Sequence, residues 1–235
     1  LGSISALGVD LTQNSASFFS PNAAFSLKAN EIANIVQNVG IGGREGIGQM
    51  PSYELNGTRT DYVQVLPPSL QMTSVSGSVE FPYNTPQILY PSQYGQMRIY
   101  SAGDIDGLVI AMDDTDPGRL GGAFTTVLQL YQLPGVTIAT RNDQLRAQHN
   151  QRITHLGNSE PIRIYTNGSI NQGAMFLPKQ ARISADGDIV DLFFQGQNVS
   201  RLDTTRVVAG GDIKGTISAG FNNLPYVRSN NFILG

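Results

Sequence analysis

Short apolar segments broken by a glycine and a small polar residue recur along the chain. We align these segments on the Ile or Val that follows each Gly-polar pair, and we include one member in which Asn replaces Gly. The aligned triplets are Gly2-Ser3-Ile4, Asn30-Glu31-Ile32, Gly77-Ser78-Val79, Gly103-Asp104-Ile105, Gly168-Ser169-Ile170, Gly187-Asp188-Ile189 and Gly211-Asp212-Ile213. Such recurrence indicates a repeat architecture, because a catalytic loop is normally present once.

The positions around each aligned residue are apolar at fixed offsets. The apolar residues six positions before it are Ile99, Ile164, Ile183 and Val207, and those three or four positions after it are Ile35, Leu108, Leu192 and Ile217. This pattern predicts a strand, a tight corner and a second strand. Because Gly and Asn adopt a positive φ most readily, we predict a left-handed backbone at the first residue of each triplet. These corner residues include Asn30, Gly77, Gly103, Gly168, Gly187 and Gly211.

The spacing of the triplets predicts the fold class. Consecutive aligned residues lie 28, 47, 26, 65, 19 and 24 positions apart. We expect units of about twenty residues, with unmarked turns in the two longest intervals and about ten units in all. Short strands joined by tight corners and stacked about 4.8 Å apart form a parallel β-helix. The chain is therefore expected to be an all-β solenoid, with residues 1–235 as a single β-helical segment.

Three stretches interrupt the repeat, and we expect them to project from the solenoid as loop excursions. Residues 40–61 are rich in Gly and polar side chains, and residues 111–122 form an acidic turn. Residues 141–160 form the third stretch, in which 141–152 has the pattern of a helix with a polar surface. Interruptions of a repeat are where a partner would be bound, so Arg146 and His149 are candidate partner contacts.

Composition and charge narrow the classes of function. The chain has 15 Lys and Arg against 18 Asp and Glu, and the basic residues form no run along the sequence. This distribution argues against nucleic acid or an anionic membrane as the partner, because both need a concentrated positive face. The absence of Cys excludes thiolate zinc sites, no apolar stretch is long enough for a membrane helix, and we expect no cofactor. The start at Leu1, with no signal peptide, leads us to expect a piece of a longer polypeptide.

The aspartates of the triplets allow two interpretations. Asp104, Asp188 and Asp212 could align along one face as a catalytic set, as the carboxylates of polysaccharide-active enzymes do. The favoured interpretation is structural, in which each side chain accepts backbone N–H bonds and fixes the corner. Ser occupies the same position in other triplets and can accept the same bond, yet it cannot act as an acid or base. We therefore expect no catalytic residue among them.

The remaining chemistry-bearing residues give weaker signals. Asp113, Asp114 and Asp116 resemble a minimal calcium loop, but the other ligands of known calcium motifs are missing. A solvated acidic turn is the favoured interpretation, and no metal site is expected. His149 and His155 are the only histidines, and we expect both at the surface without a metal or catalytic partner.

Two tyrosines share one repeat position. Tyr100 and Tyr165 directly follow the apolar Ile99 and Ile164, so alternation along a strand predicts that the tyrosines point outward. A stacked outward pair is either ordinary cross-strand packing or an aromatic contact surface for protein or sugar. Tyr100 and Tyr165 are therefore candidate partner contacts.

Three longer phrases carry a family resemblance. They are GQMRIYSAGDIDGLVIAMDDTDPGRL, EPIRIYTNGSI and LPKQARISADGDIVDLFFQGQNVSRLDTTRVVAGGDIKG. In the last phrase, Lys179 to Ile189 leads to Gly196-Gln197-Asn198 and then to Ala209 to Ile213. In these phrases the chain resembles the C-terminal conserved region of one branch of the filamentous-haemagglutinin family of large exoproteins. The resemblance covers residues 65–218.

The resemblance implies a right-handed parallel β-helix in a protein secreted by, or displayed on the surface of, a Gram-negative bacterium. It implies export through an outer-membrane two-partner transporter, recognised by a domain outside this chain. It further implies service as a non-catalytic adhesin or exoprotein segment that contacts a target-cell protein or glycan receptor. The alternatives are a receptor-binding segment of a contact-dependent inhibition toxin system and a polysaccharide-active enzyme on a β-helix.

Overall fold

The structure is a computed structural model that describes residues 19–33, 54–55, 58–59, 64–81, 87–112, 114, 153–215 and 231–234. Across these residues the regular structure is β throughout and contains no helix. The strands form two parallel sheets and one short antiparallel pair. The described part therefore confirms the all-β class and its parallel strands, whereas the two sheets do not close on each other. No helix long and apolar enough to cross a membrane occurs among the described residues.

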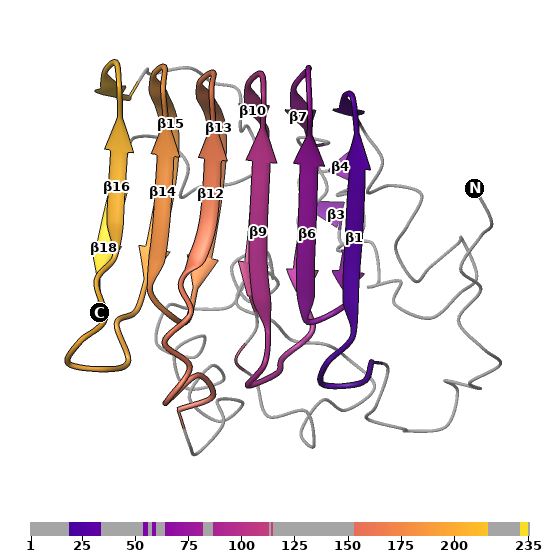
Figure 1. Cartoon of the computed structure of the whole chain (residues 1–235), viewed down its shortest axis with the longest axis vertical. Coiled ribbons are helices and arrows are strands. Elements are labelled where there is room, and N and C mark those ends of the chain that lie inside the picture. Colours follow the sequence, from indigo (N-terminus) through magenta and orange to yellow (C-terminus); the bar gives the residue numbers. More distant parts are fainter. Residues whose placement is uncertain are drawn as a thin grey trace, which may run out of the picture.

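The first sheet contains six parallel strands that lie side by side in Figure 1. In spatial order they are β1 (Ala24–Ala29), β6 (Ser69–Ser74), β9 (Gln96–Ser101), β12 (Ile162–Thr166), β14 (Ala181–Ala185) and β16 (Arg206–Ala209). Their spatial order is also their order along the chain. Each strand therefore pairs with its counterpart in the next repeat.

The second sheet is built from the strands that follow these six. Those directly after the corners are β2 (Ile32–Ala33), β7 (Val79–Glu80), β10 (Ile105–Asp106), β13 (Ile170–Leu177), β15 (Ile189–Gly196) and β17 (Ile213–Lys214). Further along are β5 (Gln64–Leu66), β8 (Gln87–Leu89), β11 (Val109–Met112) and β18 (Asn231–Leu234). The long strand β13 pairs with both β10 and β11, so one strand in one repeat corresponds to two shorter strands in its neighbour.

Each first-sheet strand, its corner and the second-sheet strands after it make one repeat unit, and the described residues contain six of them. The aligned residues of the triplets are paired in register from unit to unit. The pairs are Ile32–Val79, Val79–Ile105, Ile105–Ile170, Ile170–Ile189 and Ile189–Ile213. The alignment made from the sequence is therefore confirmed for six of its seven members, and Ile4 lies outside the described residues.

The number of units inferred from the spacing is wrong. Ile32 pairs directly with Val79, and Ile105 pairs directly with Ile170. The intervals of 47 and 65 residues therefore each separate adjacent units and contain no additional unit in the stack. The extra length lies between β2 and β5 in the first case and between β11 and β12 in the second.

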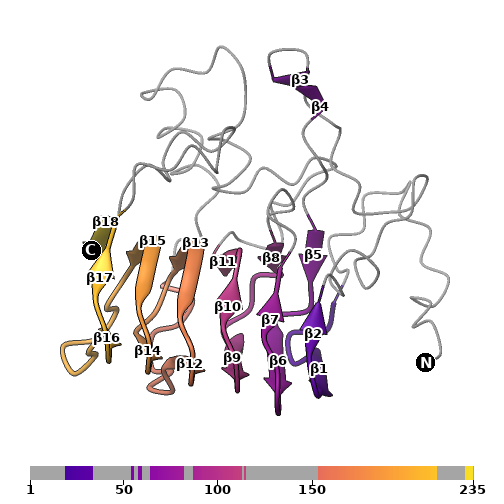
Figure 2. The same cartoon turned by 90° about the horizontal axis from the view of Figure 1, so that it is seen from above.

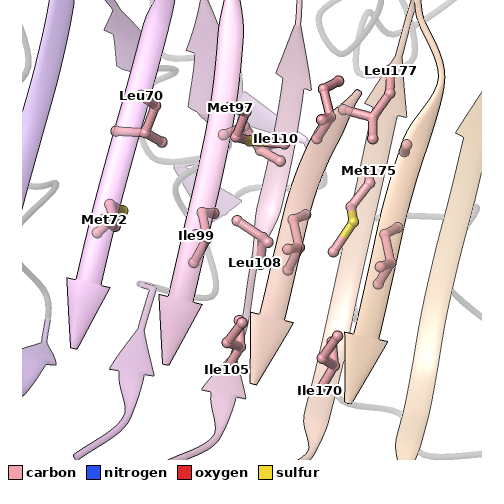
Figure 3. Close-up of a cluster of buried hydrophobic side chains, with 14 of the residues drawn as sticks. Leu70, Met72, Met97, Ile99, Ile105, Leu108, Ile110, Ile170, Met175 and Leu177 are labelled. Carbon is pink, nitrogen blue, oxygen red and sulfur yellow. The ribbon is translucent and has the colours of Figure 1, made fainter. Parts of the chain in front are cut away.

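The hydrophobic core lies between the inward faces of the two sheets. Leu70, Met97 and Ile99 of the first sheet and Ile105 and Ile110 of the second belong to one cluster, and each is at most 2% exposed. Figure 3 shows these side chains with their neighbours between the strands. Alternation along each first-sheet strand therefore places Ile and Met inside and leaves the intervening residues on the outer face.

The corner glycines have a different role from the predicted one. None of the corner residues Asn30, Gly77, Gly103, Gly168, Gly187 and Gly211 has a positive φ. Glycine is needed there because the units pack closely. A Cβ at Gly103 would lie 2.9 Å from the carbonyl carbon of Gly77, and a Cβ at Gly168 would lie 2.8 Å from that of Gly103. Asn30 is in β1's unit, at the edge of the described sheet, where no described unit lies on the crowded side.

The left-handed positions lie two residues after the aligned Ile, at a second bend. Gly107, Gln172 and Asp191 have φ values of 69°, 53° and 52°. These residues occupy equivalent places, because Ile105, Ile170 and Ile189 are paired in register. The second bend accommodates non-glycine residues in two of the three units, so its space is less restricted than that of the first corner.

Replacing Gln172 by Gly is expected to raise the free energy of unfolding by about 1 kcal/mol, because a left-handed backbone costs about that much for a residue with a Cβ. Urea unfolding followed by circular dichroism measures the change. Gln195→Gly is the matched control, because Gln195 lies inside β15 without a positive φ, and there the glycine should destabilise. A loss of stability in Gln172→Gly would contradict the strain at this bend.

The excursions are described only in part. Ala111 and Met112 belong to the buried strand β11 rather than to a loop, so the second excursion starts later than predicted. In the stretch 40–61 the structure describes only the antiparallel pair β3 (Glu54–Leu55) and β4 (Thr58–Arg59), which lies apart from the two sheets in Figure 2. The predicted helix 141–152 lies outside the described residues, and a turn occupies 154–157.

Candidate functional site

Four arginines form a row on the outer face of the first sheet. Arg98, Arg163, Arg182 and Arg206 lie on β9, β12, β14 and β16, and each pairs in register with the next. All four are exposed. Adjacent strands in a sheet are about 4.8 Å apart, so the row spans about 15 Å. We call these four residues the arginine row.

One carboxylate bridges the first two members of the row. Glu160 Oε1 lies 3.2 Å from Arg98 Nη2 and 3.1 Å from Arg163 Nη2. Arg182 and Arg206 form no ion pair with any residue that the structure describes. Half of the row therefore carries a compensating charge, and the other half presents two guanidinium groups to solvent.

Tyr100 and Tyr165 lie beside the row on the same face. Their ring centroids are 5.6 Å apart with an interplanar angle of 13°, so the rings are stacked. Each side chain is more than one third exposed, and the predicted outward direction is confirmed. The Tyr165 hydroxyl donates to Asp186 Oδ2 at 2.9 Å. This bond stabilises the neutral phenol and raises the pKa of Tyr165.

A ladder of hydrogen bonds joins the corners of successive units. The N–H of Gly103 donates to the carbonyl of Gly77 at 2.8 Å, and the N–H of Gly187 donates to that of Gly168 at the same distance. The side chain of the second triplet residue adds a second bond to the next unit. Ser169 N donates to Asp104 Oδ1 at 2.6 Å, and Asp212 N donates to Asp188 Oδ1 at 2.8 Å.

The corner aspartates thus accept backbone N–H bonds, as predicted, but the donor belongs to the next unit rather than to the same turn. Serine does the same in alternate units, since Asp188 N donates to Ser169 Oγ at 3.1 Å. Asp188 also pairs with Lys214, whose Nζ lies 2.6 Å from its Oδ2. The bond from Lys214, together with the Asp212 N–H, lowers the pKa of Asp188. The same ion pair raises the pKa of Lys214.

Buried hydroxyl groups form a second polar line behind the corners. Ser74, Ser101 and Thr166 are 0% exposed and are paired in register. Ser101 Oγ donates to the Asp104 carbonyl at 2.9 Å, and Thr166 Oγ1 bonds to the Gly103 carbonyl. Sequence reasoning missed this line, although its members all stand at the end of a first-sheet strand.

Two ionisable side chains are buried at the opposite ends of the first-sheet strands. Lys179 is 0% exposed, and its Nζ donates to the Gly95 carbonyl at 3.3 Å. Burial lowers the pKa of Lys179 to about 8. His155 is 1% exposed, so its predicted surface position is wrong. Burial, together with the nearby Lys179 ammonium, lowers the pKa of His155 to about 4.

The remaining predicted site residues are not brought together. Asp113, Asp116, Arg146 and His149 lie outside the described residues. Asp114 is described and is partly exposed. Within the described ranges there is no group of three or more His, Cys, Asp or Glu side chains that could hold a metal ion.

The arginine row is the feature of this face that sequence reasoning missed. Its members are separated by 65, 19 and 24 residues, so no basic run is visible along the sequence. Each of them directly precedes the apolar residue that stands six positions before an aligned Ile. The same alignment that located the corners would have located the row. No family model, no curated protein and no solved structure matches this chain.

Proposed function

We propose that the chain is a non-catalytic segment of a secreted, surface-displayed exoprotein of the filamentous-haemagglutinin type. In this proposal the repeat units wind as a right-handed parallel β-helix that extends and presents contact surfaces to a target cell. Export uses an outer-membrane two-partner transporter through a domain outside this chain. The proposal rests on the sequence resemblance together with the way in which the repeated residues are used.

The observation that carries the proposal is the use of the recurrent triplets to join one unit to the next. Asp104 and Asp188 each give a carboxylate oxygen to the N–H of the following corner. Ser169 fills the same place with a hydroxyl, although a hydroxyl cannot replace a catalytic carboxylate. A row of side chains engaged in stacking is what an extended scaffold needs.

The arrangement of strands supports the finer fold. Every unit runs from a first-sheet strand through a corner to second-sheet strands, and the units pair in parallel in chain order. Extra chain enters between strands without changing the pairing of the units on either side. A solenoid tolerates such additions, because each unit contacts only its neighbours.

Attachment of coated beads to cells tests this function. Beads that carry the purified chain should bind target cells above the level of beads coated with serum albumin. The Asp188→Ser/Asp212→Ser double variant should attach as well as the wild type, since serine makes the same corner bond in the neighbouring units.

Incubation with a panel of polysaccharides provides the enzymatic test. The proposal expects no release of reducing ends or unsaturated sugars by the wild type. Product release that the double variant abolishes would establish the polysaccharide-active alternative, and failure of wild-type beads to attach to any cell type would contradict the contact function.

A further inference from the structure

We propose that the arginine row is a docking surface for a linear carboxylated polysaccharide, laid across the strands of the first sheet. The inference deepens the proposed function and rests on it for its biological setting, since it names the chemical class that the displayed face contacts. Its test uses the purified chain without cells, so the two proposals can fail separately.

The row has the geometry of a track for an extended polymer. One guanidinium group projects from each of four successive strands, on one face and in register. The row therefore repeats its positive charge at about the strand spacing of 4.8 Å and runs perpendicular to the strands. A linear polymer with regularly spaced anions can pair with successive arginines without bending.

Glu160 shows how a carboxylate fits between two neighbouring arginines. A single oxygen of Glu160 lies within 3.2 Å of both Arg98 and Arg163. Because the same register continues along the row, the space between Arg182 and Arg206 offers a carboxylate the equivalent position. No described residue forms an ion pair with either of these two arginines. The structure thus supplies the binding mode at one end of the row and leaves it free at the other.

The stacked tyrosines provide a surface for the sugar rings. Tyr100 and Tyr165 lie two residues after Arg98 and Arg163 on the same outer face. Next to Tyr165 in register is Ser184, whose small side chain leaves room beside the ring. An aromatic ring with a hydroxyl at its tip suits the mixed apolar and polar surface of a sugar.

Charge favours a carboxylated polysaccharide over more highly charged polyanions. The whole chain has a net charge of −3, and its two unpaired arginines in the row give a short positive stretch. DNA and anionic membranes need broad positive surfaces to release their counterions or to bind their headgroups. Local guanidinium–carboxylate pairing needs only matched geometry, and arginine provides this with its planar fork of donors.

Calorimetric titration of the purified chain with a homogeneous oligogalacturonate tests the proposal. We expect saturable binding to the wild type, and no binding of the same oligomer after methyl esterification. The Arg182→Gln/Arg206→Gln variant should bind about tenfold more weakly, because two exposed charged contacts are lost. The Lys28→Gln/Arg201→Gln variant carries the same change in charge at exposed positions outside the row, and its affinity should stay within about twofold of the wild type.

Removal of the internal carboxylate gives a second, opposite readout. Glu160→Gln frees Arg98 and Arg163 and should strengthen binding about threefold, whereas Glu80→Gln, an exposed control on β7, should leave the affinity unchanged. Each substituted side chain is exposed, and circular dichroism and thermal melting verify that each variant folds.

The proposal is overturned if the oligogalacturonate does not bind or if the two double variants weaken binding equally. Tighter binding of dextran sulfate, duplex DNA or vesicles of anionic phospholipid would also overturn it, since each would identify a different partner. Bead attachment without oligogalacturonate binding would leave the proposed function standing and remove this inference. Oligogalacturonate binding without bead attachment would do the reverse.

Discussion

Gly168→Ala is expected to lower the free energy of unfolding by about 3 kcal/mol, the upper range for an overpacked interior. A Cβ at this position would lie 2.8 Å from the carbonyl carbon of Gly103 and would also meet the side chain of Asp104. The backbone atom cannot move without disturbing the N–H bond from Gly168 to the Gly103 carbonyl. Urea denaturation followed by circular dichroism measures the loss.

Gly157→Ala separates crowding from backbone strain. Gly157 has a φ of 85°, and no atom lies within 4 Å of the position that a Cβ would occupy there, so alanine should cost about 1 kcal/mol through strain alone. Gly168 has no positive φ, so its larger expected loss comes from contact between units. If Gly168→Ala loses no more stability than Gly157→Ala, close stacking does not explain the corner glycines.

Lys179→Met is expected to raise the free energy of unfolding at pH 7 by about 2 kcal/mol. The Lys179 side chain is fully buried, and its Nζ donates a hydrogen bond to the Gly95 carbonyl. Its pKa of about 8 lies below the usual 10.5 because burial disfavours the ammonium. Met has a similar length and needs no compensating partner, so the substitution removes the cost of burying a charge.

The pH dependence identifies the cause. A folded-state pKa below the unfolded value means that the unfolded state binds more protons between pH 8 and pH 10.5. Wild-type stability therefore rises through this window as the buried lysine loses its charge. The advantage of Lys179→Met should be largest below pH 8 and should shrink towards pH 10.5, as measured by urea denaturation at several pH values.

Lys28→Met is the matched control, because Lys28 is exposed on β1 and its replacement should change stability little at any pH. An advantage of Lys179→Met that is constant from pH 7 to pH 10.5 would show that packing, and not the buried charge, is responsible.

The order of residues along each first-sheet strand was predictable from the sequence. Ile99 and Ile164 were placed inside, and Tyr100 and Tyr165 outside, by alternation alone. The aligned Ile and Val residues occupy one register position, as the triplet alignment required. These predictions succeeded because strand alternation and apolar spacing are local properties that the chain carries in its sequence.

The identity of neighbouring units was not predictable. Ile105 lies next to Ile170 although 65 residues separate them. The entropy cost of closing a loop grows only slowly with its length, so an insertion can leave the stack and return without altering the pairing. Interval lengths therefore do not count units, and the arginine row, which depends on which units are adjacent, was invisible along the sequence.

The sequence by itself determined that the chain is all-β, where its corners lie and which residues face inward. Only the tertiary structure decided why the corners need glycine, because the obstruction at Gly103 and Gly168 comes from the preceding unit and not from the local backbone. It also decided that Lys179 and His155 are buried and that Arg182 and Arg206 are neighbours. Each of these features depends on residues brought together by stacking, and the spacing along the chain does not encode that contact.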